Sequence, residues 1–181
     1  MGNKDWHLAE TLVQVRNEWI ALIGERLIND QGKELNYWRV ERSDSVLILP
    51  IHQGMFLLPQ PVYRPGIGQR TYDFPGGRHD PTISLEQAAR QILSRELQIY
   101  PEHVDELRPV NEDGWNVDSS FSSQKIFVFQ AWIMDNVSLN SETVHIAYPA
   151  NMSGAQQLLA RLSCLQCRCA LLEWMLINQM V

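Results

Sequence analysis

A glycine-rich turn followed by an amphipathic helix is the feature that most constrains how this chain can fold. The turn is Asp73-Phe-Pro-Gly-Gly77, inside a stretch dense in glycine and proline that predicts a loop with at most a short strand near Tyr72. Ser84 opens the predicted helix and Pro101 closes it. Apolar residues recur at i, i+3 and i+4 through this helix, at Leu85, Ala88, Ala89, Ile92, Leu93 and Leu97. This spacing predicts a helix with one buried face.

Strand patterns lie on both sides of this helix. Residues 18–40 predict two strands around the turn-rich tetrapeptide 29–32, and the apolar run at 45–50 is typical of a strand buried on both faces. A second apolar run follows His52-Gln53-Gly54, which indicates a hairpin. Residues 125–134 (KIFVFQAWIM) predict a further strand. Together these patterns predict a mixed α/β domain.

Both ends of the chain are expected to be helical. Residues 5–17 have the pattern of a short amphipathic helix with Asp5 as its N-cap. A capping-box pattern at Ser153 predicts the start of one long C-terminal helix. The middle of that helix is apolar nearly all round, which indicates burial against a partner as well as the core. We therefore expect a helical extension at 1–17 and a single domain over 18–181.

Composition favours a soluble cytoplasmic protein. Lys and Arg number 15 against 21 Asp and Glu, which gives a formal net charge of −6. Such a balance argues against a general nucleic-acid or membrane-surface binder, although a few arginines can still hold a small anionic ligand. No apolar stretch approaches the roughly 18–20 residues that a membrane helix needs. The first residues also lack the apolar region of a signal peptide.

Three cysteines, Cys164, Cys167 and Cys169, lie close together near the C-terminus. An odd number is a poor basis for a set of disulfides. The C-x-x-C spacing is compatible with zinc, but a structural zinc site needs four ligands and no second Cys or His pair follows. Within a helix, Cys169 would also lie away from the face that the other two share. We interpret all three as small buried thiols, with metal or redox chemistry as the alternative.

The turn at Gly77 and the helix after it resemble the Nudix signature, G-x5-E-x7-R-E-U-x-E-E-x-G-U, in which U is aliphatic. With the first glycine of the signature on Gly77, its aliphatic positions and the paired alanines usual in ADP-ribose pyrophosphatases fall on Leu93, Ile99, Ala88 and Ala89. The resemblance covers roughly residues 18–175. It implies an α/β Nudix fold, with mixed β-sheets sandwiched by helices, of the ADP-ribose and nucleotide-sugar pyrophosphatase type.

Most charged positions of this signature are changed here. In the same register only Glu96 is kept, and the other positions read Ile83, Gln91, Ile92, Arg95 and Gln98. A Nudix helix presents carboxylates at i, i+3 and i+4 that hold Mg²⁺ on a diphosphate, and here these positions read Ile92, Arg95 and Glu96. One carboxylate is too few for several ions, and Arg95 repels a cation beside it. The resemblance therefore implies a pyrophosphatase-like protein with weak or no activity.

Arg95 suggests another use for the same site. A guanidinium in the place of the metal offers positive charge and a forked set of donors to a diphosphate. We interpret the chain as a pseudoenzyme that binds a nucleoside diphosphate and has a regulatory or scaffold role. The candidate ligand contacts are Arg64, Gly77, Arg78 and Arg95, with Trp115 or Phe121 stacking on a base. The alternative for Arg95 is an ion pair with Glu96 or Glu86 on a solvated helix face.

An active hydrolase of ADP-ribose or a nucleotide sugar is the alternative function. Its catalytic residues would be Glu96, also a weak candidate ligand for Mg²⁺, and Glu142, which lies where family members often carry a further Glu. The acids of loop 111–124 are weaker candidates: Glu112, Asp113 and Asp118. The resemblance also implies a homodimer built from N-terminal strands and C-terminal helices, and the apolar C-terminal helix fits a different protein partner equally well.

Overall fold

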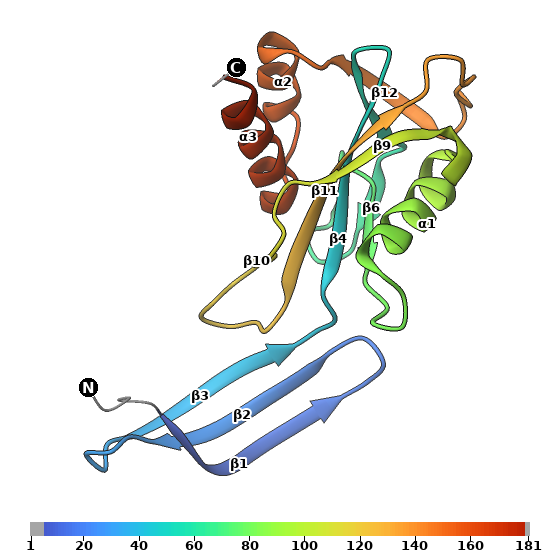
Figure 1. The fold of residues 1–181 in the computed structure, drawn as a ribbon. Helices are drawn as coiled ribbons and strands as arrows, with labels where there is room; N and C mark the ends of the chain where they lie inside the picture. Colours follow the sequence, from blue (N-terminus) through green and yellow to red (C-terminus); the bar gives the residue numbers. More distant parts are fainter. Residues whose placement is uncertain (1–5, 180–181) are drawn as a thin grey trace. The chain divides into compact units, whose positions relative to one another are not determined.

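The chain forms two compact units in the computed structural model, which describes residues 6–179 (Figure 1). The first unit contains residues up to 44 together with 116–125. The second contains residues 45–115 together with those from 126 onward. Asp5, the expected N-cap of an N-terminal helix, lies outside the described residues.

An antiparallel sheet in the order β1-β2-β3 makes up most of the first unit. Its strands are β1 (His7–Arg16), β2 (Ala21–Ile28) and β3 (Glu34–Glu41). The strand pair predicted around residues 29–32 is confirmed as β2 and β3. The helix predicted over 5–17 is wrong, because residues 7–16 form β1, which pairs with β2 from His7 to Arg16 with two register shifts. A lone helix of that size is marginal in water, whereas the strand gains its hydrogen bonds from a neighbour.

One face of the first unit's sheet carries an ionic cluster around Arg39, and the opposite face carries an apolar cluster. On the ionic face, Arg39 bonds Glu25 at 2.9 Å and Glu41 at 2.7 Å, and these hydrogen bonds lower the pKa of both carboxyl groups. The apolar face, as we define it, consists of four partly exposed side chains that the strand registers place together: Val13, Val15, Leu22 and Trp38. Trp38 lies over Gly24, where an added Cβ would be 2.9 Å from the indole ring.

A seven-stranded mixed sheet forms the centre of the second unit. Its main path is β10-β11-β4-β5-β12, with β8 beside β4 and β9 beside β11, and β4 runs parallel to β11. The strands are β4 (Ser45–His52), β5 (Met55–Pro59), β8 (Gly76–Arg78), β9 (Val104–Pro109), β10 (Trp115–Asn116), β11 (Lys125–Ile133) and β12 (Val144–Pro149). The strands predicted at 45–50 and 125–134 and the hairpin after residue 52 are confirmed.

The glycine- and proline-rich stretch holds more strand than its composition indicates. A two-stranded hairpin is formed by β6 (Val62–Arg64) and β7 (Gln69–Thr71), and the short strand expected near Tyr72 ends one residue before it. Gly68, in the turn of this hairpin, has a positive φ of 67°, which a glycine adopts without steric cost.

Helices cover both faces of the large sheet, as Figure 1 shows for α1 (Leu85–Leu97) on one side and α2 (Met152–Leu159) with α3 (Leu165–Gln179) on the other. A short 3₁₀ turn, η1 (Pro101–His103), follows α1. The predicted apolar stripe of α1 packs on the sheet through Ala88, Ala89, Ile92, Leu93 and Leu97. Burial of each Leu or Ile in this set contributes roughly 1.5–3 kcal/mol. The predicted α/β fold with helices on both sides is confirmed.

The C-terminal segment forms two helices, so the single long helix predicted there is wrong. Asn151, and not Ser153, caps α2, by accepting a hydrogen bond from the Gly154 amide at 2.9 Å. Arg168 donates to the carbonyl oxygens of Leu159 at 2.6 Å and Leu162 at 3.0 Å. The carbonyl at the end of α2 and one in the segment that follows are therefore bonded by a side chain, where a continuous helix would use backbone amides.

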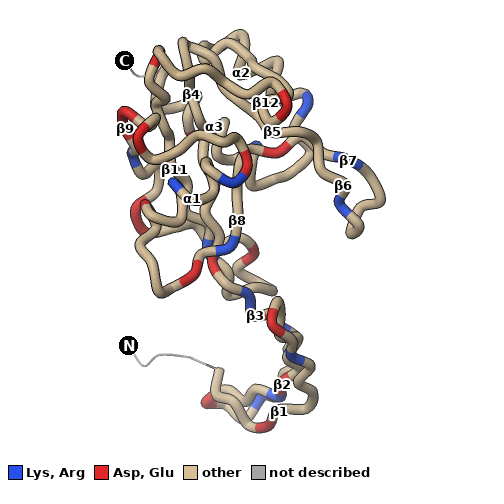
Figure 2. The backbone as a smooth tube through the Cα atoms, turned by 90° about the vertical axis from the view of Figure 1, so that its right-hand side faces the viewer, with Lys and Arg blue, Asp and Glu red and all other residues tan. Residues whose placement is uncertain are grey.

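Charged residues of both signs are interspersed along both units, as Figure 2 shows. Within residues 6–179, none of the helices has the length and the hydropathy that crossing a membrane requires.

Candidate functional site

The helix that carries the altered signature, α1, is capped at both ends. The Ser84 hydroxyl accepts a hydrogen bond from the Gln87 amide at 3.1 Å, and the Gln87 side chain accepts one from the Ser84 amide at 3.0 Å. At the other end, Gln98 adopts a left-handed backbone with a φ of 56°. The resemblance places a glycine at this position, and left-handed backbone favours glycine. The backbone here therefore supports the register that sets the signature on Gly77.

Arg95 and Glu96 form an ion pair against strand β8. Arg95 Nη2 donates to Glu96 Oε1 at 2.6 Å and to the Gly76 carbonyl at 3.3 Å, and the Gly76 amide donates to Glu96 Oε2 at 3.3 Å. A Cβ on Gly77 would lie 2.9 Å from Arg95 Nη2, so this glycine makes room for the guanidinium. The Arg95 side chain is 60% exposed and that of Glu96 is 25% exposed. The ion pair with Glu96, considered as an alternative for Arg95, is therefore present.

Two signature positions that would carry glutamate face the interior. Ile92 is 2% exposed within the core cluster beneath α1, and its side chain would contact a Cβ on Gly77 at 3.4 Å. Ile83 is half-buried and packs against the same cluster. Two positions that the resemblance aligns with glutamates therefore carry apolar side chains in or against the core, and Glu96 is the one carboxylate among positions 92, 95 and 96.

Other predicted ligand contacts are spread over separate elements. Arg64, in β6, donates through Nε at 3.0 Å and through Nη2 at 2.5 Å to one oxygen of Asp73. Arg78 is exposed in β8, next to Gly77, and Trp115 is half-buried in β10. Phe121 is 45% exposed and belongs to the first unit. Of the predicted ligand contacts, Gly77 and Arg95 therefore lie together beside Glu96, whereas Arg64 is bonded to Asp73.

The loop that carries Glu142 is tied to the end of α1. Thr143 Oγ1 donates to the Leu97 carbonyl at 3.1 Å, and Asn140 Nδ2 donates to Gln98 Oε1 at 2.8 Å. Glu142 itself is exposed. Among the described residues, neither Glu142 nor Glu96 belongs to a group of three or more potential metal ligands. The acids of the preceding loop, Glu112, Asp113 and Asp118, are also exposed and outside such a group.

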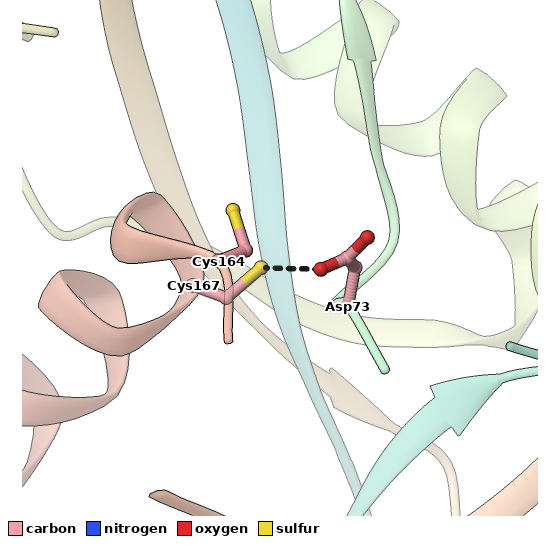
Figure 3. A group of neighbouring side chains, drawn as sticks. All are labelled: Asp73, Cys164 and Cys167. Carbon is pink, nitrogen blue, oxygen red and sulfur yellow. Dashed lines mark hydrogen bonds between the residues drawn. The ribbon is translucent and has the colours of Figure 1, made fainter. Parts of the chain in front are cut away.

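One such group brings together Asp73 and two of the cysteines, Cys164 and Cys167. One oxygen of Asp73 and the two sulfurs all lie within 4.8 Å of one another. Cys167 Sγ is 3.9 Å from Asp73 Oδ1 and points toward it in Figure 3. Sequence reasoning missed this group because Asp73 is distant in the chain, although the C-x-x-C spacing was its signal. The expectation of three buried thiols is also wrong, since only Cys167 is buried and Cys169 is exposed.

The two clustered thiols have opposite pKa shifts. A hydrogen bond from Cys167 and backbone amides at the start of α3 lower the pKa of Cys164 to about 6, although burial opposes this change. The interaction with Cys164 and burial raise the pKa of Cys167 well above the ordinary range. Cys164 is therefore the thiolate of the pair at neutral pH, and Cys167 keeps its proton.

Alkylation by iodoacetamide tests this difference. In reduced, chelator-treated protein we expect the rate at Cys164 to be half-maximal near pH 6 and to level off above pH 7, because its thiol has a pKa of about 6. The rate would be measured by mass spectrometry of the modified peptide. Replacing Cys167 with Ala should move the midpoint upward toward the ~8.5 of an ordinary thiol. A wild-type rate that continues to rise through pH 8 contradicts the prediction.

Comparison with known proteins agrees with this architecture. No family model matches the chain, and neither does any curated protein sequence. Among solved structures, the chain is similar to one described as an ADP compounds hydrolase, with a TM-score of 0.76 and 17% sequence identity. The match covers 99% of this chain and 96% of that one.

The fold class follows from this likeness together with the layers described above. The chain has a Nudix-like α/β fold, in which helices flank a mixed sheet. At 17% identity the comparison establishes the fold alone, and the chemistry of the site has to be argued from its own residues.

Proposed function

We propose that this protein binds a nucleoside-diphosphate ligand without hydrolysing it and acts as a regulatory or scaffold protein. The 2.6 Å ion pair between Arg95 and Glu96, beside Gly77 at the turn into α1, carries the part of the proposal that excludes hydrolysis. It occupies the part of the helix where a hydrolase of this fold needs several free carboxylates.

The ion pair opposes metal-dependent hydrolysis in two ways. It engages the one carboxylate left on this face, and it places a fixed positive charge beside that carboxylate. Mg²⁺ prefers about six oxygen ligands in near-octahedral geometry, and Ile92, in the core, supplies none. Without bound metal, no group at this face activates a water or stabilises the charge that develops on a leaving phosphate.

The same guanidinium supports binding of a diphosphate. Within the described residues, the hydrogen bonds of Arg95 all run through Nη2, which leaves Nε and Nη1 for a ligand. A phosphate oxygen can accept from this fork in a charge-assisted geometry. Arg78 is exposed at the next position after Gly77, so a second basic side chain follows directly. Arg64 and Trp115 complete the proposed contacts, with Trp115 stacking on the base.

Calorimetry with ADP-ribose, ADP-glucose and NADH tests the proposal. The similar structure, described as an ADP compounds hydrolase, supports the choice of these compounds. We expect at least one of them to release heat at a single site in the presence of a chelator, because a guanidinium replaces the metal. The absence of heat with all three, with and without Mg²⁺, contradicts ligand binding.

An active hydrolase of ADP-ribose or a nucleotide sugar is the second candidate. Its support is the pair of hydrogen bonds that ties loop 140–143 to the end of α1, the helix that carries Glu96. If a diphosphate displaced Arg95 from Glu96, a Mg²⁺ ion held by Glu96 and Glu142 would supply the chemistry.

A phosphate-release assay separates the two candidates. The diphosphate panel would be incubated with Mg²⁺ or Mn²⁺ and a coupled phosphatase, using wild type and Glu96→Gln. We expect the release to equal the background in both proteins. Metal-dependent turnover that Glu96→Gln abolishes would establish the hydrolase instead.

We also propose that the chain works as a homodimer. The support is the apolar face of the β1-β2-β3 sheet, where Val15 is 63% exposed, Trp38 44% and Val13 41%. A partly exposed apolar surface of this kind is typical of a contact site between proteins. A different protein partner on the same face is the alternative, and the two outcomes differ in the mass of the purified protein.

A further inference from the structure

We propose that Asp73, Cys164 and Cys167 form a binding site for one thiophilic divalent cation of the zinc class. The three residues come from the turn after β7, the residue before α3 and the first turn of α3. The site uses none of the residues of the Arg95–Glu96 pair. It shares Arg64 with the proposed nucleotide contacts, because Arg64 bonds Asp73, but its ligands and its test do not depend on a bound nucleotide.

The spacing of the three donor atoms fits a single small ion. A tetrahedral zinc ion with bonds of about 2.3 Å to sulfur and 2.0–2.2 Å to oxygen holds its ligand atoms roughly 3.5–3.8 Å apart. Here the Cys167 sulfur lies 3.9 Å from Asp73 Oδ1, and no two of the three atoms are more than 4.8 Å apart. Side-chain adjustments of less than about 1 Å would bring all three to bonding distance.

The surrounding contacts orient the ligands for this role. Arg64 and Thr71 both donate to Asp73 Oδ2, which fixes the carboxylate and leaves Oδ1 directed at the cysteines. The Phe74 amide donates to the Cys167 sulfur at 3.4 Å, a bond that favours the thiolate needed for metal ligation. Hydrogen bonds from outside a metal site commonly orient its ligands in this way.

The charges of the site also balance around a dication. Two thiolates and the Asp73 carboxylate carry three negative charges, and the Arg64 guanidinium at 2.5 Å from Asp73 carries one positive charge. A divalent ion therefore makes the group neutral, which suits a partly buried position. Three protein ligands leave the fourth position of a tetrahedral ion open for water or another donor. Cys164 is only partly buried, so an ion has access to the site.

A disulfide between Cys164 and Cys167 is the competing use of these residues. It would draw the two sulfurs to about 2.05 Å. Asp73 Oδ1, which lies 3.9 Å from the Cys167 sulfur, would have no part in that bond. A cation uses all three groups that the fold brings together, and this difference favours the metal site.

Cobalt titration tests the proposal, because cobalt bound by thiolates has an intense sulfur-to-metal absorption. The full chain would be reduced, stripped with a chelator and titrated with Co²⁺, and Zn²⁺ would then be added. We expect one equivalent of Co²⁺ to produce the band and Zn²⁺ to displace it. Zn²⁺ should also raise the melting temperature.

Four variants identify the side chains that bind the metal. Cys164→Ser and Cys167→Ser should each weaken Co²⁺ binding by about 100-fold or more and remove most of the band, and Asp73→Asn should weaken it about 10-fold. Cys169→Ser is the matched control, since Cys169 is exposed and lies outside the group, and it should bind like wild type. Cys164→Ser changes a partly exposed residue, so it keeps the test valid if Cys167→Ser fails to fold.

Three results would overturn the proposal. The first is reduced wild-type protein that shows no thiolate–cobalt band. The second is a band that persists in Cys164→Ser or disappears in Cys169→Ser. The third is metal-free protein, purified without reductant, whose mass shows a Cys164–Cys167 disulfide and which still binds no metal after reduction.

Discussion

Arg95→Glu is expected to weaken binding of ADP-ribose by about 100-fold, which corresponds to the ~3 kcal/mol of a strong charge-assisted contact. The substitution removes the forked donor and places a second negative charge beside Glu96, where it repels the diphosphate. Stability should change little, because the Arg95 side chain is 60% exposed and surface ion pairs contribute about 0–1 kcal/mol. Calorimetry of both proteins, with melting temperatures as a check on folding, gives the result.

Two further variants separate the effect of the forked guanidinium geometry from the effect of the positive charge. Arg95→Lys keeps the charge and loses the fork, so it should fall between wild type and Arg95→Glu. Arg90→Glu changes the same charge on the same helix, where the Arg90 side chain donates to the Pro101 carbonyl, and it should bind like wild type. Equal losses in Arg90→Glu and Arg95→Glu would show that net charge, and not this site, governs the affinity.

Arg95→Glu should also remain unable to release phosphate. The carboxylate set of the signature needs position 92 as well, and Ile92 is 2% exposed in the core beneath α1. A glutamate introduced there would be buried beside leucine and alanine side chains, at a cost of several kcal/mol unless it were paired. Position 92 therefore cannot carry an unpaired carboxylate without a large cost to the packing of α1.

Val15→Glu is expected to convert a dimer into a monomer at micromolar concentration. Val15 is 63% exposed on the apolar face, opposite Leu22 in the strand register, so an interface on this face would bury the new charge without a partner. Such a charge costs several kcal/mol, which weakens association by at least about 100-fold. Multi-angle light scattering on a size-exclusion column measures the mass directly.

The controls for this experiment use exposed apolar residues in different positions. Trp38→Glu changes a second residue of the same face and should give the same shift in mass. Ile67→Glu changes an apolar residue that is 58% exposed in the β6–β7 turn of the second unit, and it should leave the mass unchanged. A wild-type protein that is monomeric at all concentrations contradicts the homodimer. That result would favour a different protein partner on the apolar face.

Local patterns in the sequence predicted the elements that follow local rules. The spacing of the α1 stripe, its cap at Ser84 and the apolar runs that became β4 and β11 are each encoded within a few residues. The register of the signature on Gly77 stays a prediction from the sequence, with which the left-handed backbone at Gln98 is compatible. Helix propensity and hydrophobic period act over such short distances.

The errors occurred where a distant partner decides the conformation. Residues 7–16 become a strand because β2 supplies their hydrogen bonds, and the C-terminal helix breaks where the Arg168 side chain bonds the carbonyls at the end of α2. The pattern of apolar residues alone does not distinguish these outcomes, since tertiary contacts override weak local preferences.

The sequence by itself determined that an amphipathic helix follows Gly77 and that Glu96 is the one carboxylate among positions 92, 95 and 96. Only the tertiary structure decided that Glu96 is bonded to Arg95 and that Ile92 belongs to the core. It also brought Asp73 beside Cys164 and Cys167, which are about 90 residues away in the chain. The physical reason is that spacing defines which side chains share one helix face, whereas the packing of separate elements defines which side chains meet across the fold.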